Sequence, residues 1–222
     1  MELKHSSRCR LTRYNVADFP GDNLFDAIGR VVSLAECLPR KELYEAWEVA
    51  KRVRKHVRGR PVLDLAAGHG LLAWLLLMLD QDVPSARCVD RRRPESAHVL
   101  QAALEAHWPR LAGRLTWEVG DLASASVSPE ELVVSVHACG ALTDRVLDAA
   151  LAARAPVAVL PCCQSMGKCD TGGLRTWLEG RLAVDVVRVM RLKEAGYVVK
   201  AQLIPEAITP QNRLIIALPG ST

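Results

Sequence analysis

The chain has 222 residues, of which 50% are apolar and 24% are charged, and its formal net charge is +4 at pH 7. This composition is that of a folded protein, and it excludes global disorder and a collagen-like fibre. The longest unbroken apolar run covers residues 71–79 and is shorter than the roughly 20 residues that cross a bilayer. The first residues are polar and basic rather than of the signal-peptide type. We therefore expect one main folded domain, located in the cytoplasm.

Six lysines and arginines crowd residues 51–60, at the end of a helical pattern. They form either a surface for a polyanion such as RNA or a solvated helix end whose cations complement the helix dipole. The seven cysteines have irregular spacings in a chain large enough to build its own core. A disulfide framework is therefore not expected.

The periodicity of the apolar residues predicts alternating helices and strands. Residues 39–57 have the spacing of an amphipathic helix, and a short apolar strand, 62–65, leads through a glycine turn into an all-apolar helix, 71–79. Residues 1–38 match no pattern, and we expect an N-terminal extension or lid there, with the main domain over 39–222.

The alternation continues to the end of the chain. Strands are predicted at 87–90, 115–119, 132–137 and 156–160, with helices between them, and a helical stretch at 173–195 precedes two β-branched runs, 197–204 and 214–218. This order predicts an α/β fold with a mainly parallel sheet that ends in an antiparallel hairpin. Ligands of such folds collect at the carboxyl ends of the strands.

The glycine turn allows two cofactors. Residues 68–73 fit the dinucleotide pattern G-x-G-x-x-G/A, and Asp90 lies where a ribose-binding carboxylate belongs, so an NAD-dependent oxidoreductase is one hypothesis. Asp64, at the end of the first strand, would repel a pyrophosphate but attract the ammonium or sulfonium of S-adenosylmethionine. The charge at Asp64 therefore favours the methyl donor.

A third acidic residue, Asp121, follows the third predicted strand. Carboxylates at three successive strand ends are a stronger signal than one glycine motif. The alternative interpretation of Asp90 and Asp121 is ordinary helix or turn capping.

Residues 62–70, Val-Leu-Asp-Leu-Ala-Ala-Gly-His-Gly, resemble motif I of class I S-adenosylmethionine-dependent methyltransferases. Ala66 stands where that family has its first glycine. The resemblance implies a Rossmann-like domain with a mainly parallel seven-stranded sheet. The cofactor-binding residues that follow from it are Asp64, Ala66, Gly68, Gly70, Asp90, Arg91, Asp121, Leu122 and His137.

Three further motifs, at residues 137–144, 161–164 and 208–213, resemble the methyltransferase group that contains the acceptor-stem tRNA ribose 2′-O-methyltransferases. This resemblance implies an RNA acceptor, with tRNA favoured. A small-molecule methyltransferase and a noncatalytic S-adenosylmethionine-binding module are the alternatives to it.

Three residues are candidates for catalysis: His137, Cys139 and Cys162. His137, at the end of the fourth strand, is the best-placed general base for a ribose hydroxyl, or it packs beneath the cofactor. Cysteines after two neighbouring strands are similar to the arrangement of RNA 5-methylcytosine enzymes, in which one thiolate attacks the base. Cys139, Cys162, Cys163 and Cys169 could also bind a metal or only pack, and we expect no metal because no C-x2-C pair occurs.

Overall fold

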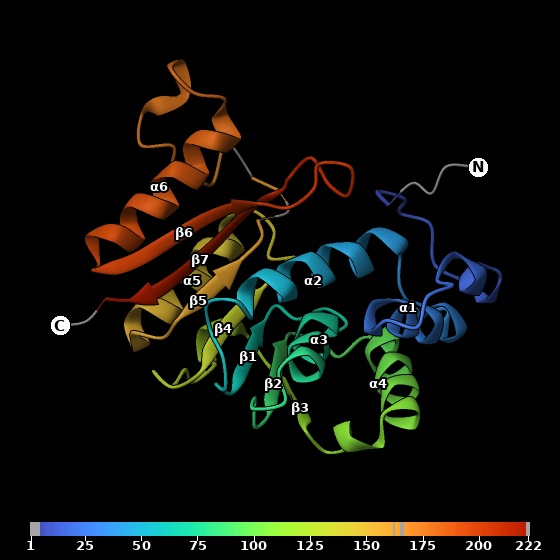
Figure 1. Ribbon diagram of the computed structural model, residues 1–222. Helices are drawn as coiled ribbons and strands as arrows, with labels where there is room; N and C mark the ends of the chain where they lie inside the picture. Colours follow the sequence, from blue (N-terminus) through green and yellow to red (C-terminus); the bar gives the residue numbers. More distant parts are fainter. Residues whose placement is uncertain (1–4, 162, 165–166, 221–222) are drawn as a thin grey trace.

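The computed structural model describes residues 5–161, 163–164 and 167–220, and its centre is one seven-stranded sheet (Figure 1). β1 to β5 are parallel to one another, and β7 pairs antiparallel with β5 and β6. This arrangement confirms the predicted fold class. The strand order is β3 (Leu115–Val119), β2 (Ala86–Asp90), β1 (Val62–Leu65), β4 (Leu132–Ser135), β5 (Val157–Val159), β7 (Arg213–Pro219) and β6 (Tyr197–Leu203).

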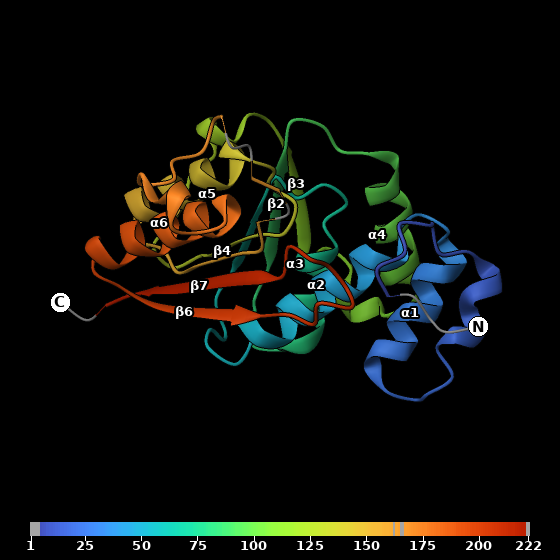
Figure 2. The same cartoon turned by 90° about the horizontal axis from the view of Figure 1, so that it is seen from above.

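Helices cover both faces of the sheet. Figure 2 shows α5 and α6 on one side and α2 and α3 on the other. The helices are α1 (Leu24–Ala35), α2 (Arg40–Val53), α3 (Leu71–Leu79), α4 (Glu95–His107), α5 (Ala141–Ala153) and α6 (Gly180–Glu194), with short 3-10 turns η1 (Arg13–Asp18), η2 (Pro109–Leu111), η3 (Leu122–Ser124) and η4 (Leu174–Thr176).

The side chains of the strands alternate between two apolar clusters. Val62 and Val134 belong to the cluster on the α3 side, whereas Leu63 and Val133 belong to the cluster beneath α5. The long apolar run of the sequence is α3, which is enclosed by the sheet and α2, and its residues 71–78 are all buried. Over the described part of the chain, no helix combines the length and the apolarity that crossing a membrane requires.

The described part of residues 1–38 is built into the core. Leu11, Phe19 and Ile28 are almost completely buried in the same cluster as α3, and α1 packs against α4. The Asn23 side chain caps α1 by accepting a hydrogen bond from the Asp26 backbone N–H. Asparagine is a preferred residue at this position, so the sequence contained a signal for the start of this helix. The segment is a covering layer of the α/β domain, and its role as a lid stays a prediction.

The helix expected over 173–195 starts later than predicted. Gly173 adopts a left-handed conformation (φ 73°), and η4 ends in an irregular turn before α6 begins at Gly180. The Glu179 side chain accepts a hydrogen bond from the Leu182 backbone N–H and so caps α6. Residues 167–179 are therefore a separate segment between β5 and α6.

Candidate cofactor and acceptor site

The turn between β1 and α3 is tight and has a left-handed backbone at three positions. Ala66 (φ 56°), Gly68 (φ 59°) and Gly70 (φ 75°) all have positive φ. At Gly70 a Cβ atom would lie 3.0 Å from the Trp117 ring and 3.1 Å from Cys88 Sγ. Ala66 carries the strain that a glycine would avoid. The turn thus keeps the shape expected of motif I despite the alanine.

Asp90 fixes this turn from the neighbouring strand. The Gly68 backbone N–H donates to Oδ2 of Asp90 at 2.9 Å. A cleft of about 450 Å³ opens beside them at the carboxyl ends of the strands. Of the residues predicted to bind the cofactor or to catalyse, those that line the cleft are Ala66, Gly68, Asp90, Arg91, Asp121, Leu122, His137 and Cys139.

Asp121 lies at the cleft with a cation that the sequence analysis missed. Nη2 of Arg145, from the first turns of α5, donates to Oδ1 of Asp121 at 2.6 Å. The same carboxylate accepts from the Ala123 backbone N–H and caps η3. These hydrogen bonds, first the one from Ala123 and then the one from Arg145, lower the pKa of Asp121. Capping and a place at the cleft are therefore both realised at this residue.

Asp64 and Gly70 do not line the cleft. Asp64 is 2% exposed, on the α3 side of β1, where its carboxyl accepts a hydrogen bond from the Ala73 backbone N–H. Burial raises the pKa of Asp64 to about 8. The carboxyl therefore connects β1 to α3 and is protonated at neutral pH, so it does not supply the charge expected from the sequence. Contact of Asp64 and Gly70 with a cofactor stays a prediction.

His137 leads from β4 to the floor of the cleft and has two ionisable neighbours. Nε2 of His69 lies 2.7 Å from Oε2 of Glu42, which α2 supplies, and the His69 and His137 rings are 6.1 Å apart. Nε2 of His137 is buried, and no described residue forms a hydrogen bond with it. Burial lowers the pKa of His137. The histidine is therefore neutral at pH 7 and has a nitrogen available for a proton.

Glu42 and the two histidines lie close enough to be considered as metal ligands, because one ligand atom from each falls within 4.8 Å of the others. The hydrogen bonds argue against that role. The Leu71 backbone N–H donates to Nδ1 of His69 at 3.1 Å, so Nε2 carries the hydrogen that Glu42 accepts. A metal on Nε2 would require a ring with no hydrogen on either nitrogen, whereas metal-bound histidines normally donate from the other nitrogen.

The cysteines are placed as follows. Cys139 and Cys163 are exposed and Cys169 is buried, while Cys162 lies outside the described residues. Among the cysteines that the structure does describe, no set falls within reach of a shared metal. A nucleophilic role for Cys139 and Cys162 stays a prediction.

The matches to known proteins agree with this geometry. Residues 40–167, more than half of the chain, match the model of a family described as a methyltransferase domain. The chain belongs to this methyltransferase family. No curated protein matches the sequence.

Solved structures share the fold of this methyltransferase at low sequence identity. An O-methyltransferase family protein from Burkholderia thailandensis has a TM-score of 0.52 and 17% identity, over 95% of this chain and 64% of its own. The m1A22 tRNA methyltransferase TrmK of B. subtilis has a TM-score of 0.52 and 12% identity, over 80% of this chain and 65% of its own. Human N-acetylserotonin methyltransferase, in complex with SAM, has a TM-score of 0.50 and 13% identity, over 94% of this chain and 66% of its own. The chain thus spans slightly less than two thirds of these proteins.

A buried arginine joins the turn after β4 to α6 in this methyltransferase. Arg188 of α6 is 1% exposed, and it donates to both carboxylate oxygens of Asp144 (2.9 Å each), to Asp185 (3.1 Å) and to the Gly140 carbonyl (2.9 Å). Asp185 also accepts from Arg213 at 2.6 Å. The turn after β4 is therefore fixed to α6 by one side chain.

We expect Arg188→Met to lower the free energy of unfolding by about 3 kcal/mol, because it leaves the Asp144 carboxylate without its main partner in a partly buried site. Thermal denaturation would measure the loss. Arg191→Met is the matched control, since Arg191 is 38% exposed and its pairs with Asp144 and Asp148 contribute less than about 1 kcal/mol. Equal losses in the two variants would contradict the role assigned to Arg188.

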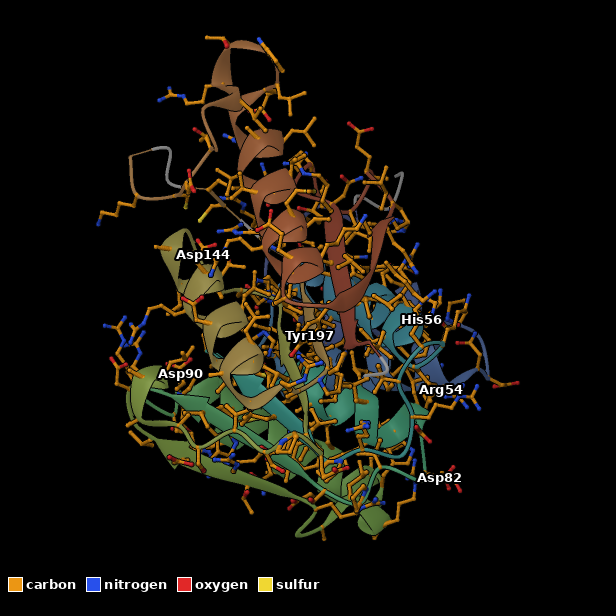
Figure 3. All side chains as sticks on the ribbon, turned by 90° about the vertical axis from the view of Figure 1, so that its left-hand side faces the viewer. Arg54, His56, Asp82, Asp90, Asp144 and Tyr197 are labelled. Atoms are coloured by element: carbon orange, nitrogen blue, oxygen red, sulfur yellow. The ribbon has the colours of Figure 1, made fainter. Side chains whose placement is uncertain are left out.

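The basic stretch 51–60 lies far from the cleft. Figure 3 shows Arg54 and His56 at one end of the molecule, away from Asp90 and Asp144. Glu42, in the first turn of α2, contacts His69, and the last residue of the helix, Val53, lies about 17 Å further along the helix axis. Glu48 forms ion pairs with both Lys51 and Arg52. Arg60, at the end of the stretch, donates to the Pro129 and Glu130 carbonyls just before β4.

Proposed function

We propose that this methyltransferase uses S-adenosylmethionine and transfers the methyl group to RNA, with tRNA favoured. The observation that carries the proposal is the cleft at the strand ends, which is lined by a backbone-anchored Asp90 and by His137, whose buried Nε2 has no hydrogen-bond partner among the described residues. The motifs that resemble those of the acceptor-stem tRNA ribose 2′-O-methyltransferases support the acceptor.

The residues at the cleft fit the proposed cofactor. One oxygen of Asp90 is occupied by Gly68, which leaves the other to accept hydrogen bonds from ribose hydroxyls. A Cβ atom added at Gly68 would have no neighbouring atom within 4 Å, so a ligand can approach the backbone there. Leu122 and Asp121 offer an apolar contact and an acceptor for the adenine edge. S-adenosylmethionine supplies an electrophilic methyl group when it is bound.

His137 would act as the general base. A ribose hydroxyl is a poor nucleophile at neutral pH, and a neutral imidazole with a free nitrogen can accept its proton. Most of the remaining rate would come from holding donor and acceptor in line, which supplies roughly 7–11 kcal/mol in well-oriented systems.

Cofactor binding is tested by calorimetry and thermal shift with S-adenosylhomocysteine and with NAD. We expect S-adenosylhomocysteine to bind and NAD not to bind. Asp90→Ala should weaken binding at least tenfold, on the order of 1.4 kcal/mol, because the ribose loses a charged acceptor. Asp82→Ala is the control, since Asp82 is exposed at the opposite end of the molecule (Figure 3). Binding of NAD alone would refute the proposal.

The acceptor is tested by transfer of a tritiated methyl group to total tRNA, to ribosomal RNA and to small-metabolite extracts. Incorporation into tRNA is expected. Incorporation into metabolites alone would indicate a small-molecule methyltransferase, which is the class of the human N-acetylserotonin enzyme. Binding of S-adenosylhomocysteine without incorporation into any pool would indicate a noncatalytic module.

A further inference from the structure

The segment between β5 and α6 exposes an aromatic ring that the core does not use. Trp177 is 85% exposed, whereas Trp74 is completely buried and the other three tryptophans are half-buried. Tryptophan is highly buried on average in folded proteins, so exposure of this degree is unusual for this residue type. We name residues 167–181 the exposed arm.

Three cations lie on the same exposed arm as this tryptophan. Lys168, Arg175 and Arg181 are all exposed, and none of the carboxylates in the described part of the chain forms an ion pair with them. The two carboxylates of the arm are already engaged with the backbone. Asp170 accepts from the Gly172 N–H at 2.8 Å, and Glu179 accepts from the Leu182 N–H at 3.0 Å. Residues 167–181 therefore combine three cations with two carboxylates, and their net charge is +1.

The exposed arm begins beside the cleft. It follows β5, whose neighbour β4 leads to His137 and Cys139, and ligands gather at this edge of a parallel sheet. The Gly140 N–H donates to the Cys163 carbonyl at 3.0 Å, and Arg188 contacts both the Gly140 carbonyl and Cys169 Sγ. Figure 1 shows the arm projecting beyond the sheet at the start of α6.

We propose that the exposed arm binds the RNA acceptor, with Trp177 stacking on an unpaired base and Lys168, Arg175 and Arg181 contacting the flanking phosphates. The inference rests on the proposed RNA acceptor and adds to it a single-stranded or splayed nucleotide near the cleft. Aromatic rings flanked by cations are the common means of binding unpaired bases, because stacking is tolerant of sequence and the phosphates supply the charge.

Trp177 is tested by titrating the full-length protein, saturated with S-adenosylhomocysteine, with oligouridine and with total tRNA. RNA should protect the exposed tryptophan emission from acrylamide, and Trp177→Ala should weaken RNA binding roughly tenfold, whereas Trp177→Phe keeps most of the affinity. Tyr14→Ala is the matched control, because Tyr14 is 80% exposed in η1, outside the exposed arm. RNA affinity unchanged by Trp177→Ala would overturn the inference and leave Trp177 as a protein contact.

The cations are tested through the salt dependence of RNA binding. Alanine at Lys168, Arg175 and Arg181 should reduce the slope of log affinity against log salt by about two. A triple variant with the same charge change at residues 54, 55 and 58 should change the slope less, because this stretch follows α2 and its Arg54 lies far from Asp90 and Asp144 (Figure 3).

The two proposals fail in different ways. If the wild-type protein binds no RNA and methylates none, the proposed acceptor is wrong. If it binds and methylates RNA while the exposed-arm variants behave like wild type, only the inference about the arm is wrong.

Discussion

Asp64→Asn is expected to become progressively more stable than the wild type as the pH rises from 4 to 8. An unfolded chain releases the Asp64 proton at about pH 4, but burial holds it in the folded protein until about pH 8. The unfolded state therefore binds fewer protons over this interval, and the wild type loses stability as the pH rises. Asparagine cannot ionise. The difference in unfolding free energy between the two proteins should grow by on the order of 4 kcal/mol across the interval.

Urea denaturation at several pH values measures this difference. Asp82→Asn is the matched control, because it makes the same chemical change at an exposed carboxylate. A constant difference between Asp64→Asn and the wild type would mean that Asp64 is ionised in the folded state. The charge argument that the sequence suggested would then be restored.

Asp64 and Asp90 show what the sequence could and could not predict about the site. Both lie on strands that the sequence predicted, and the glycine turn between β1 and α3 was placed to the residue. However, Asp64 lies within a four-residue strand that is buried on both faces, so alternation with Leu63 and Leu65 directs it against α3. Asp90 is the last residue of β2 and reaches the edge. Applying the alternation of strand side chains to residues 62–65 would have predicted that Asp64 faces α3 rather than the edge of the sheet where Asp90 lies.

Contacts between distant elements could not be predicted in the same way. Glu42 lies on the polar face of an amphipathic helix, and only the packing of α2 on α3 places it beside His69. Arg145 is one of many cations on helix surfaces until η3 and α5 meet at the cleft. The periodicity of a single sequence specifies elements and faces. It does not specify which faces meet.

His137→Gln is expected to lower kcat by about 10²–10⁴ while leaving the affinity for S-adenosylhomocysteine within a few fold, because a general base acts on the acceptor rather than on the cofactor. Single-turnover methylation of tRNA would measure the rate, and calorimetry would measure cofactor binding. His98→Gln is the matched control, since His98 is exposed on α4. A loss confined to cofactor affinity would mean that His137 only packs beneath the cofactor.

The pH profile separates a base from a packing residue more sharply. Burial lowers the pKa of His137, while the charge of Glu42 opposes that shift, so the rate should rise with pH and level off below the ordinary histidine value of about 6.5. Glu42→Gln removes the opposing charge, and the rising limb should therefore move to lower pH. A residue with only a structural role would leave the position of that limb unchanged. The direction of the shift in Glu42→Gln thus tests the chemistry of His137 without altering the histidine itself.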